Sequence, residues 1–323
     1  MNARAQVVPL EYIRRQVKLY PAEGQVLPIQ AFIENNLHLL SEHEQGIVRD
    51  QLALFPAEQG IPGLLRVPLA RSKWISSGGR AISALRGGGR SAYLPEEQVY
   101  LKGCKPAQEP REYFNLVWNF DAQKLETRGE PQGVLSAEDV MRELLAHAFL
   151  RRHGLPALQA PLCVFAYLWQ GQARGFCLAM RSGEDLRLEN RADVENIPFS
   201  EQNRQAGFAG VDFGWYARRK ARILAEMHFA GGFRNYTNCN FGNEVMAAGT
   251  GGGDELYLLD YDKFFVLDVP RQPHADFIHR FYTCAFIELL ESATPLVLLP
   301  PQGAGEEQRA SMARALLGAH LEL

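Results

Sequence analysis

A lysine that ends an apolar run is the first residue in this sequence with a recognisable chemical use. Lys102 closes the run 99–102, and a block of three glycines, Gly87, Gly88 and Gly89, precedes it. A lysine on a strand beside a glycine loop can bind phosphate, because its charge meets an anion that backbone N–H groups surround. The three glycines are therefore candidates for a phosphate loop. Taken alone, Lys102 also fits an edge strand that exposes its lysine to solvent.

Two carboxylates stand where they can serve the same site. Glu143 lies at the border of the apolar face of a helix predicted over 136–152, from which it can pair with Lys102. Asp260 ends the apolar run 256–260, and an acid at the end of a strand can hold Mg²⁺ at the mouth of a cleft. The alternatives are a surface glutamate on a helix and an ordinary turn aspartate.

An asparagine-rich segment lies between a predicted helix and a predicted strand. Four asparagines fall at 235, 238, 240 and 243. Asparagine carbonyls can ligate Mg²⁺, and asparagine amides can orient phosphate oxygens. The preference of asparagine for turns explains one or two of the four. We therefore expect Asn240 to share a metal ion with Asp260.

The composition is that of an ordinary globular protein. The 323 residues carry a net charge of −3, with 46% hydrophobic and 22% charged residues, which excludes a disordered chain or a coiled coil. The near-neutral charge argues against a non-specific nucleic-acid binder, and no apolar run reaches the ~18–20 residues of a membrane span. Five scattered cysteines without a C-x-x-C pair indicate a reducing compartment, so we expect a cytoplasmic protein.

The elements that must position these residues form three parts. Residues 1–70 predict a helical N-terminal extension, 71–180 a β-rich lobe, and 181–323 a helical C-terminal lobe. Helices are expected over 28–40, 41–54, 136–152, 212–229, 274–292 and 305–319, with capping boxes at Ser41 and Ser136. Strands are expected within 74–103 and at 162–169, 175–180, 244–247 and 256–260, with an inserted hairpin or short helix at 105–133. The order predicts an α+β, bilobal protein-kinase-like fold with a helical N-terminal extension.

The segments that carry these residues resemble the selenoprotein O family, kinase-fold proteins known as protein adenylyltransferases. The similar segments are Leu101-Lys102-Gly103, Arg142-Glu143, Asn238-Cys239-Asn240 and Asp260-Tyr261. The resemblance implies that Lys102 binds phosphate, that Asn240 and Asp260 hold Mg²⁺, and that Arg181 and Arg187 take the terminal phosphates of an inverted nucleotide. Cys239 replaces an aspartate of the family. The 71–180 part would then be a kinase-like N-lobe.

A weaker resemblance, over 226–241, is to the lipopolysaccharide-core sugar kinases. Their loop reads His-Arg-Asp with the aspartate as base, and Asn235 stands at that place here. An amide cannot accept a proton, so base-assisted phosphoryl transfer would be weakened. The same replacement is typical of an inactive pseudokinase. His228, at the end of a predicted helix, fits helix capping or packing better than the role of a base.

These observations lead us to expect an ATP- and Mg²⁺-dependent transferase. Adenylyl transfer to a protein is the first hypothesis, and phosphoryl transfer to a sugar or other small molecule is the second. Lys102, Glu143, Asn235 and Asp260 would be the catalytic residues. A pseudokinase that binds a nucleotide or a partner without turnover is the alternative from another class. The acceptor, a protein or a small molecule, is not specified by the sequence.

Overall fold

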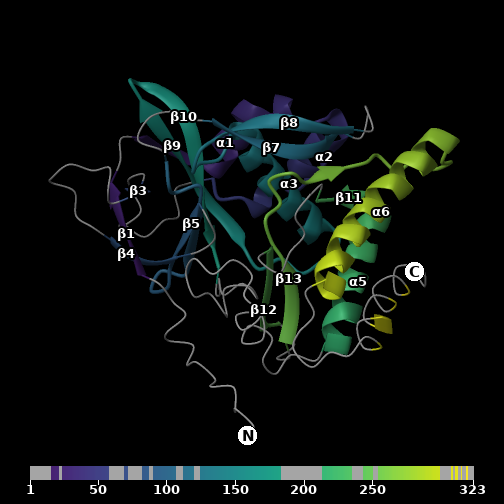
Figure 1. Ribbon diagram of the computed structural model, residues 1–323. Helices are drawn as coiled ribbons and strands as arrows, with labels where there is room; N and C mark the ends of the chain where they lie inside the picture. The colour runs from purple at the N-terminus through teal and green to yellow at the C-terminus, as the bar shows by residue number, and fades with distance from the viewer. Residues whose placement is uncertain are drawn as a thin grey trace, which may run out of the picture.

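The protein is a mixed α/β structure built on one large antiparallel sheet, seen in the computed structural model of Figure 1. The structure describes residues 16–21, 24–57, 69–71, 82–86, 90–106, 112–119, 124–182, 213–234, 243–249 and 254–298, and positions 307, 310, 311, 314 and 318. Within these described residues the sheet is open and has eight strands. In spatial order they are β2 (Gly24–Pro28), β9 (Ala160–Trp169), β10 (Gln172–Arg181), β6 (Val99–Lys102), β5 (Ser91–Leu94), β4 (Ile82–Arg86), β1 (Gln16–Pro21) and β3 (Leu69–Arg71).

Three two-stranded antiparallel pairs lie outside this sheet. They are β7 (Glu112–Asn119) with β8 (Lys124–Pro131), β12 (Glu244–Ala248) with β13 (Asp254–Leu258), and β11 (Gly232–Phe233) with β14 (Phe265–Val266). The β7–β8 pair is a hairpin, one of the two forms expected for the insertion at 105–133.

Five α-helices are described, with two short 3₁₀ turns after the first two helices. They are α1 (Ile29–Asn36), η2 (Leu37–Leu39), α2 (Glu42–Asp50), η3 (Leu52–Leu54), α3 (Ala137–Arg152), α5 (Phe213–Phe229) and α6 (Ala275–Leu298). Figure 1 shows α5 and α6 side by side at one end of the molecule, with β1, β3 and β4 at the other. Within the described ranges, no helix combines the length and apolar character that a bilayer crossing requires.

Two helix starts follow directly from local sequence. The hydroxyls of Ser41 and Ser136 accept hydrogen bonds from the backbone N–H groups of Glu44 and Asp139, whose carboxylates bond back to the capping residues. Both capping boxes were predicted, and both are confirmed. A glycine, Gly154, follows α3 with a positive φ of 65°, as expected for a helix end.

Side chains along each strand of the large sheet alternate between its two faces, and each face contributes to a separate apolar layer. Tyr100, Leu178 and Met180 belong to the layer that holds α1, α2, α3 and α5. Leu101 and Ala179 belong to a second layer on the opposite face. Lys102 shares its alternation with Tyr100, so the sheet directs it toward the helical layer and α3.

Two expectations differ from the observed fold. Residues 16–21 and 24–28 form β1 and β2 of the large sheet, whereas a helical extension was expected. β2 pairs with β9 and β1 with β4, and these partners lie too far along the chain for a local sequence pattern to indicate them. The α+β composition is confirmed at the level of a mixed α/β protein with a mainly antiparallel sheet. The bilobal kinase-like form and the boundaries at 70 and 180 stay predictions, and the helix expected at 305–319 lies mostly outside the described residues.

Candidate functional site

Lys102 lies at the centre of a buried cluster of charges. Its ammonium forms ion pairs with Glu143 of α3 and with Asp260, two residues after β13, and lies 3.7 Å from Asp262 Oδ2. Only 3% of Lys102 is exposed, so water screens these charges poorly. The contact predicted between Lys102 and Glu143 is confirmed, and Asp260 joins it. Their catalytic roles stay predictions.

A tight turn fixes the lysine at the end of β6. Gly103, the next residue, has a φ of +86°, and the N–H groups of Gly103 and Cys104 both donate to the Arg90 carbonyl at 3.0 Å. A Cβ on Gly103 would lie 2.5 Å from the carbonyl oxygen of Phe176. The turn therefore requires glycine, and it ties the lysine strand to Arg90.

The two carboxylates that contact Lys102 are themselves held in place. Glu143 is 6% exposed, and the backbone N–H of Tyr261 donates to its Oε1 at 2.9 Å. Asp260 has a φ of +67°, in the left-handed region that few residues other than glycine adopt. Strained backbone of this kind is concentrated at functional sites. The chain thus turns sharply at Asp260, and the backbone N–H of the next residue, Tyr261, is hydrogen-bonded to Glu143.

A second cation widens the cluster. Arg90 forms an ion pair with Asp262 and donates to the carbonyl of Val134 at 3.2 Å. Three carboxylates, those of Glu143, Asp260 and Asp262, therefore face two cations. Arg90 was missed by sequence reasoning, although one local signal could have found it: it directly follows the three glycines.

A third cation ties the hairpin to α3. Lys263 pairs with Asp139 Oδ1 at 2.8 Å and forms an ion pair with Glu130 of β8. Asp139 also caps α3, so one carboxylate serves both the helix start and the lysine. These contacts join residues more than a hundred positions apart, and no sequence pattern indicated them.

The electrostatics keep Lys102 charged. Burial alone would lower the pKa of its ammonium, but the carboxylates of Asp260, Asp262 and Glu143 outweigh burial and raise this pKa above its ordinary range. Burial raises the pKa of Glu143, and Lys102 opposes that shift. Lys102 is therefore a fixed cation suited to an anionic ligand, and not a base.

A small apolar pocket adjoins the cluster at Glu143 and Tyr261. Its cavity volume is about 20 Å³, room for about one water molecule, and its other walls are His147, Leu150, Ala157, Leu158, Gln159, Pro161, Met180, Leu258 and Leu259. Two buried polar atoms of the lining, the Tyr261 hydroxyl and Gln159 Nε2, find no hydrogen-bond partner in the described part of the protein. The cavity has the apolar walls and few polar groups of a small-molecule site, but its walls would have to move apart to admit a ligand larger than water.

A buried group of charged and polar side chains lies immediately before the segment 235–242. Arg234, which is 1% exposed, donates to Glu288 of α6 through Nε at 2.6 Å and through its backbone N–H at 3.1 Å. Glu288 also lies 3.0 Å from His228 Nε2, and the His228 ring stacks on Phe233. His228 is thus a packed residue of the helix end, the interpretation that the sequence favoured.

A second buried group follows the same segment. Glu244, at the start of β12, lies 2.6 Å from Lys220 Nζ and accepts a hydrogen bond from the Tyr216 hydroxyl. All three side chains are fully buried. Both ends of the asparagine-rich segment are therefore fixed by carboxylates that sequence reasoning missed, because only the fold reveals their burial.

The remaining predicted site residues are not brought to the cluster by the described structure. Arg181 pairs with Val99, three positions along β6 from Lys102, so alternation places it on the opposite sheet face, and its side chain is exposed. Asn235, Asn240, Arg187 and the glycines 87–89 lie outside the described residues. Among the residues that are described, no group of three or more His, Cys, Asp or Glu side chains is arranged around a metal position.

Comparison with known proteins identifies no family. No protein-family model matches the chain, and no curated protein matches it. A solved structure similar to it is the aerobactin synthetase IucC from a hypervirulent pathotype of Klebsiella pneumoniae, with 12% identity and a TM-score of 0.40. The match covers 95% of this chain, and the chain spans 61% of that protein's length. A similarity at this level assigns neither an activity nor a substrate.

The family resemblance expected from the sequence is therefore wrong. Comparison with protein-family models and with curated proteins finds neither the selenoprotein O family nor the lipopolysaccharide-core sugar kinases. The segments that suggested these families are short and scattered, and similarities of that kind recur by chance.

Proposed function

We propose that this protein is an ATP- and Mg²⁺-dependent transferase whose site is the Lys102 cluster. The observation that carries the proposal is the buried contact of a strand lysine with a helix glutamate and a strand-end aspartate. Protein kinases use a lysine, a glutamate and an aspartate from the same kinds of element, the lysine for phosphate and the aspartate for Mg²⁺. This chain would use Lys102, Glu143 and Asp260 in those roles, in a kinase-like arrangement.

Asp260 is the carboxylate through which this cluster would bind Mg²⁺. Three carboxylates face two cations, and the side chain of Asp260 is the most exposed of the three at 19%. Carboxylate oxygens are the ligands that Mg²⁺ prefers, together with water and phosphate. Asp260 would hold the ion, with Asp262 beside it and Asn240 as a further ligand. The ion would neutralise phosphate charge while Lys102 binds and orients the phosphate group.

The pocket beside Glu143 is the proposed place of the nucleotide base. Its apolar walls and two buried polar atoms, on Tyr261 and Gln159, would contact a planar base once the walls move apart to admit it. A fixed cation next to such a pocket matches the two ends of a nucleotide. This placement is part of the proposal.

Whether an adenylyl or a phosphoryl group is transferred depends on which residues bind the terminal phosphates of ATP. Adenylyl transfer to a protein would use Arg181 and Arg187 for them, and the placement of Arg181 away from Lys102 gives that form no support. Phosphoryl transfer to a small molecule needs only the cluster itself. A nucleotide-binding module without turnover remains the alternative, because Asn235 supplies no base.

Incubation with ATP labelled at the α- or the γ-phosphate tests the proposal. Transfer of the γ-label shows phosphoryl transfer, and transfer of the α-label shows adenylyl transfer. Lys102→Ala should reduce either transfer by at least ~100-fold, and Asp260→Asn should abolish the Mg²⁺-dependent transfer. Lys124→Ala, at an exposed lysine of β8, is the control and should change nothing. If ATP binds but no label is transferred, the protein is a nucleotide-binding module without turnover. If ATP neither binds nor transfers its label, the proposal is refuted.

A further inference from the structure

Helix α6 carries an exposed ridge of large apolar side chains. Ile278, Tyr282, Phe286 and Leu290 follow one another at intervals of four residues and are 43%, 64%, 63% and 54% exposed. Residues four apart lie on one face of a helix, so these four form a row ~18 Å long. Phe229 of α5, which is 51% exposed, lies next to this helix beside Phe281. Five of the eight large apolar side chains exposed in the described part thus gather here.

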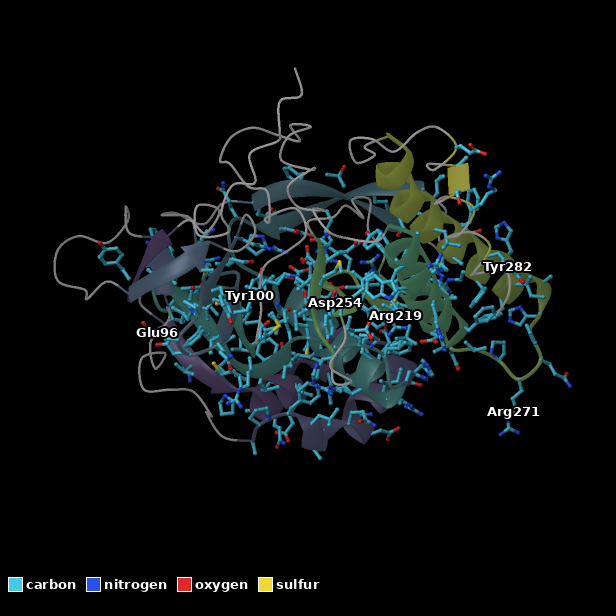
Figure 2. The ribbon with its side chains drawn as sticks, turned by 90° about the horizontal axis from the view of Figure 1, so that it is seen from below. Glu96, Tyr100, Arg219, Asp254, Arg271 and Tyr282 are labelled. Carbon is cyan, nitrogen blue, oxygen red and sulfur yellow. The ribbon has the colours of Figure 1, made fainter. Side chains whose placement is uncertain are left out.

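The ridge stands on a rigid support. Phe281 packs edge-on against Tyr282 and also against the buried Phe233, with ring centroids 5.6 and 5.7 Å apart. The opposite face of α6 buries Cys284, Ala285 and Glu288 against the rest of the protein. Figure 2 shows Tyr282 at the margin of the molecule, at the opposite end from Glu96. The ridge is therefore a fixed, outward-facing surface.

We propose that this ridge is a self-association surface, through which two copies of the chain pair with their α6 helices antiparallel. The order of the row is palindromic: an aliphatic side chain, two aromatic side chains and an aliphatic side chain. A two-fold axis between Tyr282 and Phe286 places Tyr282 against Phe286 of the second copy and Ile278 against Leu290 of the second copy. Each contact then joins side chains of the same kind and occurs twice, as the reciprocal contacts of a two-fold interface do.

The geometry and the charge pattern fit this pairing. Ridges of residues four apart interdigitate in the commonest class of helix packing, at a crossing angle near ~50°. No position of the row carries a charge, while the exposed Asp276, His279 and Arg280 provide a polar rim. Two aromatic pairs at the centre of an interface are the type of contact that dominates binding energy.

The available area predicts a weak dimer. Five large side chains, each about half exposed, offer on the order of 500 Å² per protomer. Two such faces reach the ~1,000 Å² at which specific interfaces begin. We therefore expect a reversible dimer with a micromolar dissociation constant. The pairing is independent of the proposed ATP chemistry, because the ridge and the Lys102 cluster share no residue.

Sedimentation equilibrium of the full chain at increasing concentration tests the pairing. The wild-type protein should form dimers, and Tyr282→Lys or Phe286→Glu should each weaken them by at least ~30-fold. Phe114→Glu, at a 73% exposed phenylalanine of the β7–β8 hairpin, is the matched control and should leave the dimer unchanged. A wild-type chain that stays monomeric at submillimolar concentration would overturn the proposal, as would a dimer that survives both ridge variants.

Mixing the two ridge variants tests the antiparallel register. In a mixed dimer, the lysine introduced at position 282 of one copy faces the glutamate introduced at position 286 of the other, and the second contact keeps the native Tyr282 and Phe286. The mixture should therefore dimerise at least ~10-fold more tightly than either variant alone. Equal weakness of the mixture and of the separate variants would refute the antiparallel pairing. Circular dichroism of each variant excludes unfolding as the cause of dimer loss.

Discussion

Gly103 shows how narrowly a single residue sets the position of the candidate catalytic lysine. Its φ is +86°, and a Cβ added to it would lie 2.5 Å from the Phe176 carbonyl oxygen, which leaves no room for a side chain. Any side chain here must move β6 or β10, and Lys102 with it. Gly154 offers a contrast, because its φ is also positive, at +65°, but nothing lies within 4 Å of an added Cβ.

These two glycines give a matched pair of substitutions. Gly154→Ala should cost only the ~1–2 kcal/mol of left-handed backbone. Gly103→Ala should cost a further ~1–3 kcal/mol, because its methyl group overlaps backbone. Urea denaturation followed by circular dichroism measures both. Equal destabilisation of the two variants would show that the turn after Lys102 relaxes freely.

The residues of the candidate site divide by how far the sequence could predict them. Lys102, Glu143 and Asp260 are predictable because each sits at the end or border of an apolar element, a local signal. Arg90 and Glu288 are not, because a buried charge is recognised only by its partners, and those lie far away in the sequence. Arg181 shows the converse. The sequence predicts that it lies at the end of a strand, but the face of the sheet on which it lies depends on the register of strand pairing.

At the scale of elements, helices α5 and α6 together hold Arg234, the last described residue before 235–242. Glu288 of α6 receives the Arg234 guanidinium and lies beside His228 of α5. Burial alone would raise the pKa of Glu288, but Arg234 and then His228 lower it to about 2. The folded protein therefore binds a proton at Glu288 less readily than the unfolded chain, whose glutamates titrate near ~4.3.

This shift predicts a specific loss of stability in acid. A carboxylate with a lowered pKa stabilises the fold above the unfolded pKa, and that contribution disappears as the pH falls from ~4.3 toward 2. The shift corresponds to about 3 kcal/mol. Glu288→Gln should abolish this part of the pH dependence and lower stability at neutral pH by ~3–5 kcal/mol, because Arg234 stays buried without its counter-charge.

Unfolding by urea between pH 2.5 and 7 measures this effect. Glu226→Gln is the control, since Glu226 forms a more exposed ion pair with Arg222 on α5. It should retain the acid-dependent loss of the wild type. A Glu288→Gln protein with the same pH dependence as the wild type would contradict the assignment of this loss to Glu288.

The elements also show why local patterns predict helices better than strands. Ser41 and Ser136 mark the starts of their helices together with residues three positions away, so the signal lies inside the element. β1 and β2 lack such a signal, because their partners are β4 and β9, up to about 140 residues further along the chain. The helices expected at 28–40 and 41–54 are therefore present as α1 and α2, whereas β1 and β2 stand where no strand was expected.

At the scale of the whole molecule, contacts cross both boundaries expected from the sequence. Glu44 of α2 receives hydrogen bonds from Arg142 of α3 at 2.7 Å and from the backbone N–H of Val266 at 3.0 Å. The largest apolar cluster contains residues from α1, α3, β10, α5 and β13. The parts 1–70, 71–180 and 181–323 therefore share one core, whatever their role in binding.

A shared core predicts that the chain unfolds as one unit. Cutting at 180 would expose the apolar surface of α3 that packs on Phe264 through Phe149. It would also leave Lys102 without Asp260, so fragments 1–180 and 181–323 should not fold separately. Differential scanning calorimetry of the full chain should show a single transition whose calorimetric and van't Hoff enthalpies agree. Saturating ATP with Mg²⁺ should raise the temperature of that whole transition, because ligand bound at Lys102 and Asp260 stabilises both parts together. Two transitions, of which ATP shifts only one, would instead show that the two parts fold independently and that the Lys102–Asp260 contact does not couple them.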